Sequence, residues 1–126
     1  MKKNAKVRIV NDGVEGFLGR AREHARKLDQ GEELAPEATI SFDNALDMLR
    51  VLSPERIRIL RATNQGPVSV STLCSGLKRD VRAVSRDVNL LEQYGLLFTR
   101  YQSNPGHGRR RIIEPRAARY QLVAML

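Results

Sequence analysis

The sequence has 126 residues, a formal net charge of +8 and 41% hydrophobic residues, which suits one ordinary domain with a core of its own. The start Met1-Lys2-Lys3-Asn4 leads into no apolar segment typical of an export signal. Every apolar run is well short of the ~18 residues of a membrane span, so we expect a cytoplasmic protein. The single Cys74 and the two separated histidines, His24 and His107, exclude a disulfide framework and a clustered zinc site, and we expect no metal or cofactor.

The first 42 residues predict a strand, a helix and a second strand. Lys6 to Val10 alternates in polarity and ends at the turn Asn11-Asp12-Gly13. From Val14 to Gln30, apolar residues recur at helical spacing between charged residues of both signs, which indicates a helix with a solvated face. Ala38 to Phe42 alternates again and is rich in strand-forming residues, so it is the second predicted strand.

Two further helices are predicted between residues 43 and 66. Asp43 or Asn44 caps the first, which runs to Leu52. Ser53-Pro54-Glu55 starts the second with a capping serine, a proline at the first helical position and an acid in the first turn. Its predicted buried stripe is Ile57, Leu60 and Ala62, and it ends at Gly66-Pro67.

All of the excess positive charge lies in the part of the chain that begins at Ser53. Residues 53–126 carry thirteen Lys and Arg against five Asp and Glu, whereas the first 52 residues carry nine of each. Twelve of the thirteen are arginine, whose planar guanidinium suits phosphates and guanine edges. A solvated basic surface is the alternative to a nucleic-acid-binding surface, and the positions of the arginines distinguish the two.

Two helices joined by a tight turn are predicted between Gly66 and Gly95. Ser69 is a suitable cap for the first, Gly76 and the next residues form the turn, and Asp80 caps a second helix that runs to about Tyr94. This arrangement is the helix-turn-helix pattern. The residues expected to contact DNA from the first helix are Ser69, Ser71 and Thr72.

The second of these helices has two distinct faces. At about 100° per residue, Val81, Val84, Val88 and Leu91 fall within an arc of about 80°, which predicts a core face. The opposite side carries arginine and amide side chains, which read base edges in the major groove. We expect Asp87 on a flank of the helix, paired with arginines of the same helix. The residues expected to contact DNA from this helix are Arg79, Arg82, Ala83, Ser85, Arg86 and Asn89.

A two-stranded wing is predicted after Gly95, which is expected to take a left-handed conformation. Its strands are Leu96 to Tyr101 and Arg109 to Glu114, separated by a flexible loop that contains His107. Three consecutive arginines, Arg109, Arg110 and Arg111, lie near the tip and suit phosphates or the minor groove. A disordered basic loop is the alternative interpretation.

Several segments of this region resemble the winged helix-turn-helix transcriptional regulators: Val68 to Leu73, Leu77 to Val81, Val84 to Val88 and Leu90 to Leu97. They are most similar to small prokaryotic DNA-binding proteins related to the MarR and ArsR families, in which an Arg-Asp pair opens the recognition helix and a second follows one and a half turns later. The pairs here are Arg79-Asp80 and Arg86-Asp87, and the similarity extends from about Phe42 to Glu114. The resemblance implies a bacterial or archaeal regulator, commonly dimeric, with some antitoxins in the group. The ArsR metal-binding cysteine pair is absent, so metal sensing is not implied.

The expected fold is therefore α+β and mainly α, a winged helix-turn-helix with an N-terminal strand-helix-strand extension. The expected divisions are an extension for dimerisation over residues 1–42, a DNA-binding domain over 43–115, and a C-terminal strand or tail over 116–126. The expected function is sequence-specific binding of double-stranded DNA by a homodimeric regulator, with residues 80–94 in the major groove and the wing, 96–114, on the backbone or in the minor groove. The expected dimer interface comprises Lys6 to Val10, Tyr120 to Leu126, and the helix with Phe17 and Leu28, because the winged core is not expected to need these segments.

The sequence also bears on three other functions. The main alternative is an antitoxin or protein-binding adaptor, whose basic face docks on an acidic partner such as a toxin. RNA binding is disfavoured because Phe98 and Tyr101 fall on opposite faces of their strand and form no stacking platform. No phosphate-binding glycine loop, nucleophile elbow or acid-histidine cluster is present, so we expect no enzyme activity.

Overall fold

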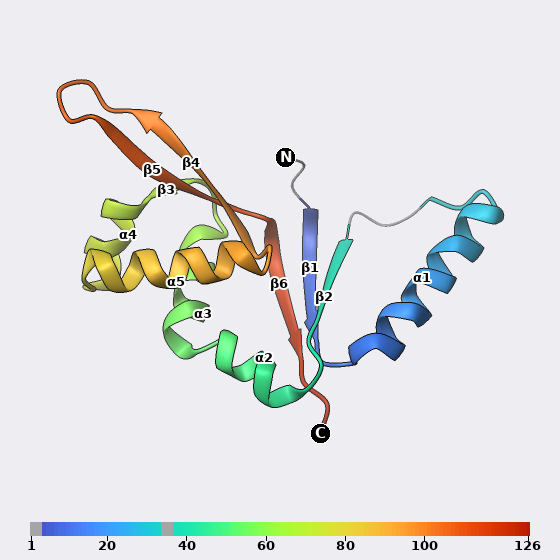
Figure 1. The fold of residues 1–126 in the computed structure, drawn as a ribbon. Helices are drawn as coiled ribbons and strands as arrows, with labels where there is room; N and C mark the ends of the chain where they lie inside the picture. The colour runs from blue at the N-terminus through green and yellow to red at the C-terminus, as the bar shows by residue number, and fades with distance from the viewer. Residues whose placement is uncertain (1–3, 34–36) are drawn as a thin grey trace.

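The computed structural model describes residues 4–33 and 37–126, and the α+β class expected from the sequence is confirmed (Figure 1). The described residues form five helices and two three-stranded sheets. In chain order the elements are β1 (Asn4–Val10), α1 (Gly13–Asp29), β2 (Glu37–Ser41), α2 (Ala45–Val51), α3 (Pro54–Thr63), β3 (Val68–Ser69), α4 (Val70–Leu77), α5 (Val81–Gln93), β4 (Leu97–Ser103), β5 (Arg109–Pro115) and β6 (Ala117–Val123).

The first sheet has the order β2-β1-β6, and both pairings are parallel. Because side chains alternate along a strand, Val7 and Ile9 of β1 point to one face and are fully buried. Lys6 and Arg8 point to the other face, where both form ion pairs with Glu37 of β2, at 3.5 and 3.8 Å. One face of this sheet therefore belongs to the core and the other is polar.

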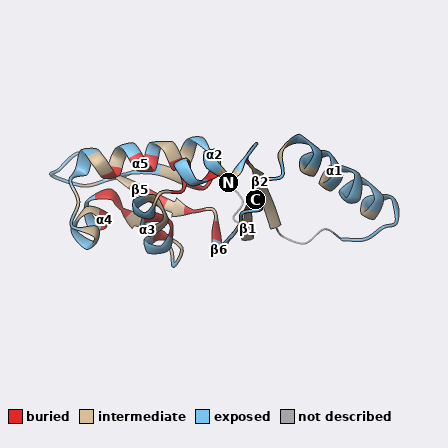
Figure 2. Cartoon of the chain, turned by 90° about the horizontal axis from the view of Figure 1, so that it is seen from below, coloured by how far each residue is buried: buried red, intermediate tan, exposed pale blue. Residues whose placement is uncertain are grey.

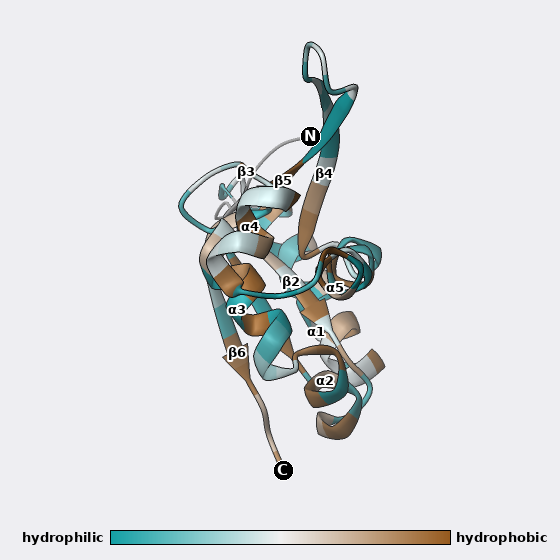
Figure 3. Cartoon of the chain, turned by 90° about the vertical axis from the view of Figure 1, so that its left-hand side faces the viewer, coloured by the Kyte–Doolittle hydropathy of each residue, from teal (hydrophilic) through white to brown (hydrophobic). Residues whose placement is uncertain are grey.

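The second sheet is an antiparallel hairpin extended by one short strand. β4 pairs with β5 from Leu97 opposite Pro115 to Ser103 opposite Arg109, and β3 adds to the far edge of β5. The hairpin projects from the helices, hydrophilic in its outer half and hydrophobic where it meets them (Figure 3). The sequence predicted the hairpin but not β3, which is two residues long and too short to give an alternating pattern.

The helix starts were predicted accurately because their caps are chemically distinctive. The side chains of Asn44, Ser53, Ser69 and Asp80 each accept a hydrogen bond from a backbone N–H in the first turn of α2, α3, α4 and α5. Each such cap typically contributes about 1 kcal/mol, so together they fix where four helices begin.

One hydrophobic core joins the helices to the first sheet. Val7 and Ile9 of β1 belong to the same buried cluster as Val84, Val88 and Leu91 of α5. This corrects the expectation that the helical core does not need β1. Strands β1 and β6, both expected at a dimer interface, are paired with each other inside the chain.

Helix α1 is the exception to this packing. None of its residues is buried, and it extends away from the other helices (Figures 1 and 2). Phe17 is 61% exposed and Leu28 is 60% exposed. Most helices in proteins are stabilised by burying an apolar face, whereas nothing among the described residues covers the apolar face of α1.

The turn between α4 and α5 differs from the expectation in detail. Gly76 lies inside α4, and the left-handed conformation falls on Lys78, with φ 54° and ψ 47°. A non-glycine residue in this region costs on the order of 1 kcal/mol, which neighbouring contacts must offset.

The core faces predicted for two helices were also wrong in part. Val81, predicted on the core face of α5, is 53% exposed at the first turn of the helix. In α3, Ile59 is fully buried and Ala62 is exposed, so the predicted stripe there was displaced.

Tyr120 joins the two sheets where β6 passes the end of α5. Its hydroxyl donates to the carbonyl of Leu96 at 2.6 Å and accepts from the backbone N–H of Arg116 at 3.0 Å. Burial raises the pKa of this phenol above its ordinary value.

Gly95, the residue before Leu96, has φ +74°, and a Cβ there would meet Nη1 of Arg116 at 2.9 Å. The expected left-handed glycine is confirmed, and the same Nη1 donates to its carbonyl at 2.8 Å.

Replacing Tyr120 with Phe should lower the free energy of unfolding by about 1 to 3 kcal/mol, because the carbonyl of Leu96 loses its donor in a poorly hydrated site. Urea denaturation measures this loss. Tyr101→Phe is the control, since Tyr101 is mostly exposed, and it should change stability by less than about 0.5 kcal/mol. Equal effects of the two substitutions would contradict the role given to Tyr120.

The pH dependence of stability provides a second measurement on the same residue. A raised pKa in the folded state means that the contribution of Tyr120 is fully present below its unfolded pKa of about 10 and is lost as the pH rises through the folded pKa. Wild-type protein should therefore lose more stability in this alkaline range than Tyr120→Phe does.

Candidate nucleic-acid interface

The outer face of α5 carries the strongest candidate residues. Val84, Val88 and Leu91 turn inward and are fully buried. Arg82, Arg86 and Asn89 lie on the other side of the helix and are exposed, as the sequence predicted. Ala83 and Ser85 are half-buried beside them. The helix therefore presents two guanidinium groups and an amide to the solvent on one side.

Asp87 is buried on α5 between two arginines from other parts of the chain. Its carboxylate contacts Nε of Arg56 at 3.0 Å and Nη1 of Arg79 at 2.9 Å. The expectation that Asp87 pairs on the flank within its own helix was wrong, because Arg56 belongs to α3 and Arg79 to the turn before α5. Arg79 thus turns toward the protein, and the structure does not bring it to the outer face with Arg82 and Arg86.

Arg56 extends this network to a third helix. Its Nη1 donates to the carbonyls of Arg50 and Val51, at 2.8 and 3.2 Å, at the carboxyl end of α2. A cation there also satisfies carbonyls that the helix leaves unpaired. One arginine therefore connects α2, α3 and α5. The role of Arg56 could not be predicted from the sequence, because an isolated arginine on a predicted helix gives no indication of its partners.

The three residues predicted at the start of α4 have different roles. Ser69 is buried and caps the helix, accepting from the N–H of Thr72 at 3.1 Å. Ser71 and Thr72 are exposed. Thr72 lies at a hollow of about 300 Å³ between α4 and the hairpin, whose other polar walls are Ser69, Arg100, Gln102 and Arg110. The hollow brings the helix start and the hairpin arginines, predicted separately, to one place.

The three consecutive hairpin arginines also divide into two kinds. Arg109 lies over the ring of Tyr101 at 4.6 Å, and Arg110 reaches Gln102 at 3.4 Å; both are exposed. The side chain of Arg111 is only 17% exposed and contacts Glu92 of α5 at 3.3 Å. Arg111 therefore connects the hairpin to α5. This role could not be predicted from the sequence, because Arg111 directly follows the exposed Arg109 and Arg110.

Glu92 is the acceptor on which this connection depends. One of its oxygens accepts from both the N–H and the hydroxyl of Thr99, at 2.9 and 2.7 Å, and the other contacts Arg111. A carboxylate on the last turns of α5 thus positions the first half of β4. The hairpin consequently keeps a fixed orientation relative to the outer face of α5.

Two acids of this region, Asp87 and Glu92, therefore pair with inward-facing or half-buried arginines, and a third, Glu114, pairs with Arg100. In the part of the chain that the structure describes, no ion pair occurs at Arg82, Arg86, Arg109 or Arg110. Exposed, uncompensated guanidinium groups on a helix and an adjacent hairpin attract a polyanion.

The other candidate chemistries have little support from the geometry. Burial raises the pKa of the Cys74 thiol, which disfavours the reactive thiolate. Among residues 4–33 and 37–126, no group of three His, Cys, Asp or Glu side chains is placed to hold a metal ion. No helix in these ranges is long and apolar enough to cross a membrane.

A family model and a solved structure are each similar to part of this chain. The family model HVO_A0114 matches residues 51–112, just under half of the chain, from the end of α2 into β5. A solved structure titled "Possible transcriptional regulator from Methanosarcina mazei Go1" is similar at 20% identity and a TM-score of 0.48. That similarity covers 54% of this chain and 61% of the length of the solved one. No curated protein matches the chain.

Asp87→Asn should lower the free energy of unfolding by about 2 to 3 kcal/mol, because two guanidinium groups then share a site without their counter-charge. We place the loss below the ~3–5 kcal/mol of a fully buried pair, since both arginine side chains are about one fifth exposed. Chemical denaturation checks it against Asp29→Asn, on the exposed surface of α1. Equal stability of the two variants would show that the network contributes nothing.

Proposed function

We propose that this chain is a winged helix-turn-helix protein that binds double-stranded DNA and regulates transcription. In this proposal α3, α4 and α5 form the three-helix core, α5 is the recognition helix in the major groove, and β4 and β5 form the wing. The observation that carries it is the exposure of Arg82, Arg86 and Asn89 together on one side of α5. Guanidinium and amide groups at this spacing can make paired hydrogen bonds to guanine and adenine edges.

The hollow between α4 and the hairpin supports a phosphate contact in the same complex. A helix start offers unpaired N–H groups, and here Arg100 and Arg110 stand on the opposite wall. Arg100 is itself paired with Glu114 at 2.6 Å, so Arg110 is the principal cation for a phosphate. Arg109 extends the contact toward the hairpin tip. The relation to the MarR and ArsR families is part of the proposal and rests on the sequence resemblance.

The proposal is tested by selecting bound fragments from genomic DNA and then measuring affinity for selected and random duplexes across a salt series. Phosphate-driven binding should weaken steeply with salt, with a slope of roughly 0.9 per phosphate neutralised. The protein should prefer the selected duplex by at least about 10³-fold. No binding at low salt would contradict the proposal and favour a protein-binding adaptor.

Arg86→Ala should weaken binding to the selected duplex by about 1 to 3 kcal/mol and leave random duplex nearly unchanged, because a lost base contact is a loss of discrimination. Arg22→Ala is the matched control: it removes one exposed arginine from α1, at the far end of the molecule from α5, and should affect neither (Figure 1). If Arg86→Ala weakened both duplexes equally, Arg86 would be a phosphate contact.

We also propose that the DNA-binding form is a homodimer whose interface includes α1. Reading two half-sites about one helical turn apart requires two copies of a module this small. The uncovered apolar face of α1 supports the choice of interface, with Val14, Phe17, Leu18 and Leu28 all exposed. The alternative, an antitoxin or adaptor, would instead use the basic face of α5 and the hairpin on an acidic partner such as a toxin.

Light scattering at tens of micromolar should give about twice the chain mass of 14.2 kDa. Phe17→Glu combined with Leu28→Glu should give the mass of one chain, since each places a charge in the buried part of the interface. Arg22→Glu, on the polar side of α1, is the control and should leave the dimer intact. A wild-type mass of one chain would overturn the homodimer while leaving DNA binding to be judged separately.

A further inference from the structure

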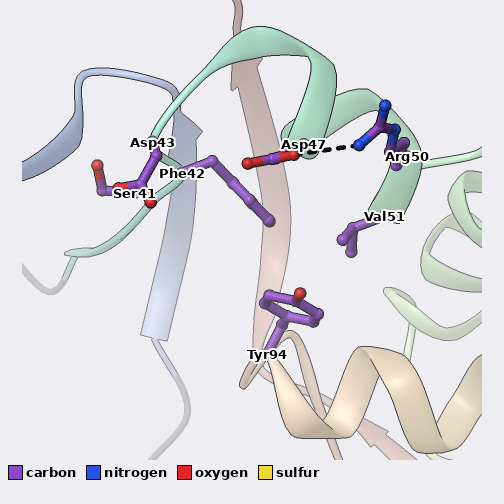
Figure 4. Close-up of a pocket in the computed structure, with 7 residues that line it drawn as sticks. All are labelled: Ser41, Phe42, Asp43, Asp47, Arg50, Val51 and Tyr94. Atoms are coloured by element: carbon purple, nitrogen blue, oxygen red, sulfur yellow. Dashed lines mark ion pairs between the residues drawn. The ribbon is translucent and has the colours of Figure 1, made fainter.

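A pocket of about 340 Å³ lies where β2, α2 and the end of α5 meet (Figure 4). Phe42, Val51 and Tyr94 provide its apolar walls, and the rings of Phe42 and Tyr94 are 5.4 Å apart. Asp43 and Asp47 lie along its rim together with Arg50. None of these residues belongs to the candidate nucleic-acid interface.

The charges of the lining select the kind of ligand. Two carboxylates and one guanidinium give the pocket a net negative charge, in a chain whose net charge is +8. Asp43 has no ion pair among the described residues, and Arg50 reaches Asp47 only at 3.6 Å from a side chain that is mostly exposed. Aromatic faces and carboxylates are the groups that together recognise an ammonium cation. The volume is at the lower end of ligand pockets, which suits a molecule with one ring.

The walls of the pocket are connected to α5 at two points. Tyr94 is the C-cap residue of α5. Arg50 and Val51 supply the two carbonyls that hold Arg56, and Arg56 contacts Asp87 in the middle of α5. A molecule that moves apart Phe42 and Tyr94, or draws Asp47 away from Arg50, therefore acts on the helix at its end and at its centre.

We propose that this pocket binds a small aromatic molecule carrying an ammonium group, and that its binding lowers the affinity of α5 for DNA. The ring lies against Phe42 and Tyr94, and the ammonium group contacts Asp43 and Asp47. The effect on DNA rests on the proposed function, whereas the binding of the ligand does not.

Binding is tested on the full chain with the probe 2-phenylethylammonium, followed by the NMR signals of the valine methyl groups. The signals of Val51 should shift in a saturable way, and those of Val68, away from the pocket, should not. The neutral analogue 2-phenylethanol should bind at least about fivefold more weakly, because it lacks the cation. Phenylacetate, with the opposite charge, should bind more weakly still.

Two variants identify the groups involved. Asp43→Asn combined with Asp47→Asn should weaken binding about fivefold or more, and Tyr94→Leu should do the same by removing a ring face. The matched control, Glu15→Gln with Asp29→Asn, removes two carboxylates from α1 and should bind as wild type does. Circular dichroism checks that each variant is folded. Any one of three results would overturn the proposed binding site. They are equal binding of the three probes, wild-type affinity in the double aspartate variant, and no shift of the Val51 signals up to the solubility limit of the probe.

The effect on DNA is measured separately, with and without saturating probe. The selected duplex should bind about fivefold or more weakly when the probe is present, and DNA should weaken probe binding by the same factor. The double aspartate variant should lose this effect but keep its affinity for DNA. An unchanged affinity with the probe bound at Val51 would overturn the coupling. A failure to bind DNA without probe would instead contradict the proposed function, so the two failures are distinguishable.

Discussion

The position of α5 depends on the carboxylates of Asp87 and Glu92. Asp87 connects the helix to α3 and to the turn that precedes α5, and Glu92 connects it to the hairpin. Hydrophobic packing of Val84, Val88 and Leu91 holds the helix against the core but is non-directional and leaves its rotation less defined. Directional contacts from charged groups, placed a turn and a half apart on one helix, set that rotation and the orientation of the hairpin together.

These two acids also sort the arginines of the region into two groups. Arg56, Arg79 and Arg111 are held against the protein by carboxylates, while Arg82, Arg86, Arg109 and Arg110 remain exposed on α5 and the hairpin. A simple count of positive charge would assign all seven to a binding surface. The geometry leaves four of them exposed for the proposed interface, and the other three hold the elements that carry those four.

The helices and their starting points could be predicted from the sequence because capping residues and apolar periodicity are local signals. Ser53-Pro54 and Asp80 are clear examples. The pairing of β1 with β6 could not be predicted, since strand order depends on contacts between distant segments and leaves no local pattern. The same limit applied to the site: Arg82 and Arg86 could be placed on a helical wheel, but Asp87 was misjudged because its partners lie in other elements. Lys78 shows a third limit, since a left-handed lysine is chosen by its surroundings and not by its own preference.

The central place of β1 in the first sheet affects the order in which the chain can fold. Its partner on one side is β2, but on the other side Val10 pairs with Val123. During synthesis the helices α2 to α5 can emerge and collapse while one edge of β1 is still open, because its second neighbour, β6, follows these helices in the sequence. Pairing β6 with β1 closes a loop that contains all the elements between them, and such closure is slow. Until the two strands pair, one edge of β1 remains exposed. We therefore expect the helical half to form first, and the sheet that joins the two ends of the chain to be the last part to assemble.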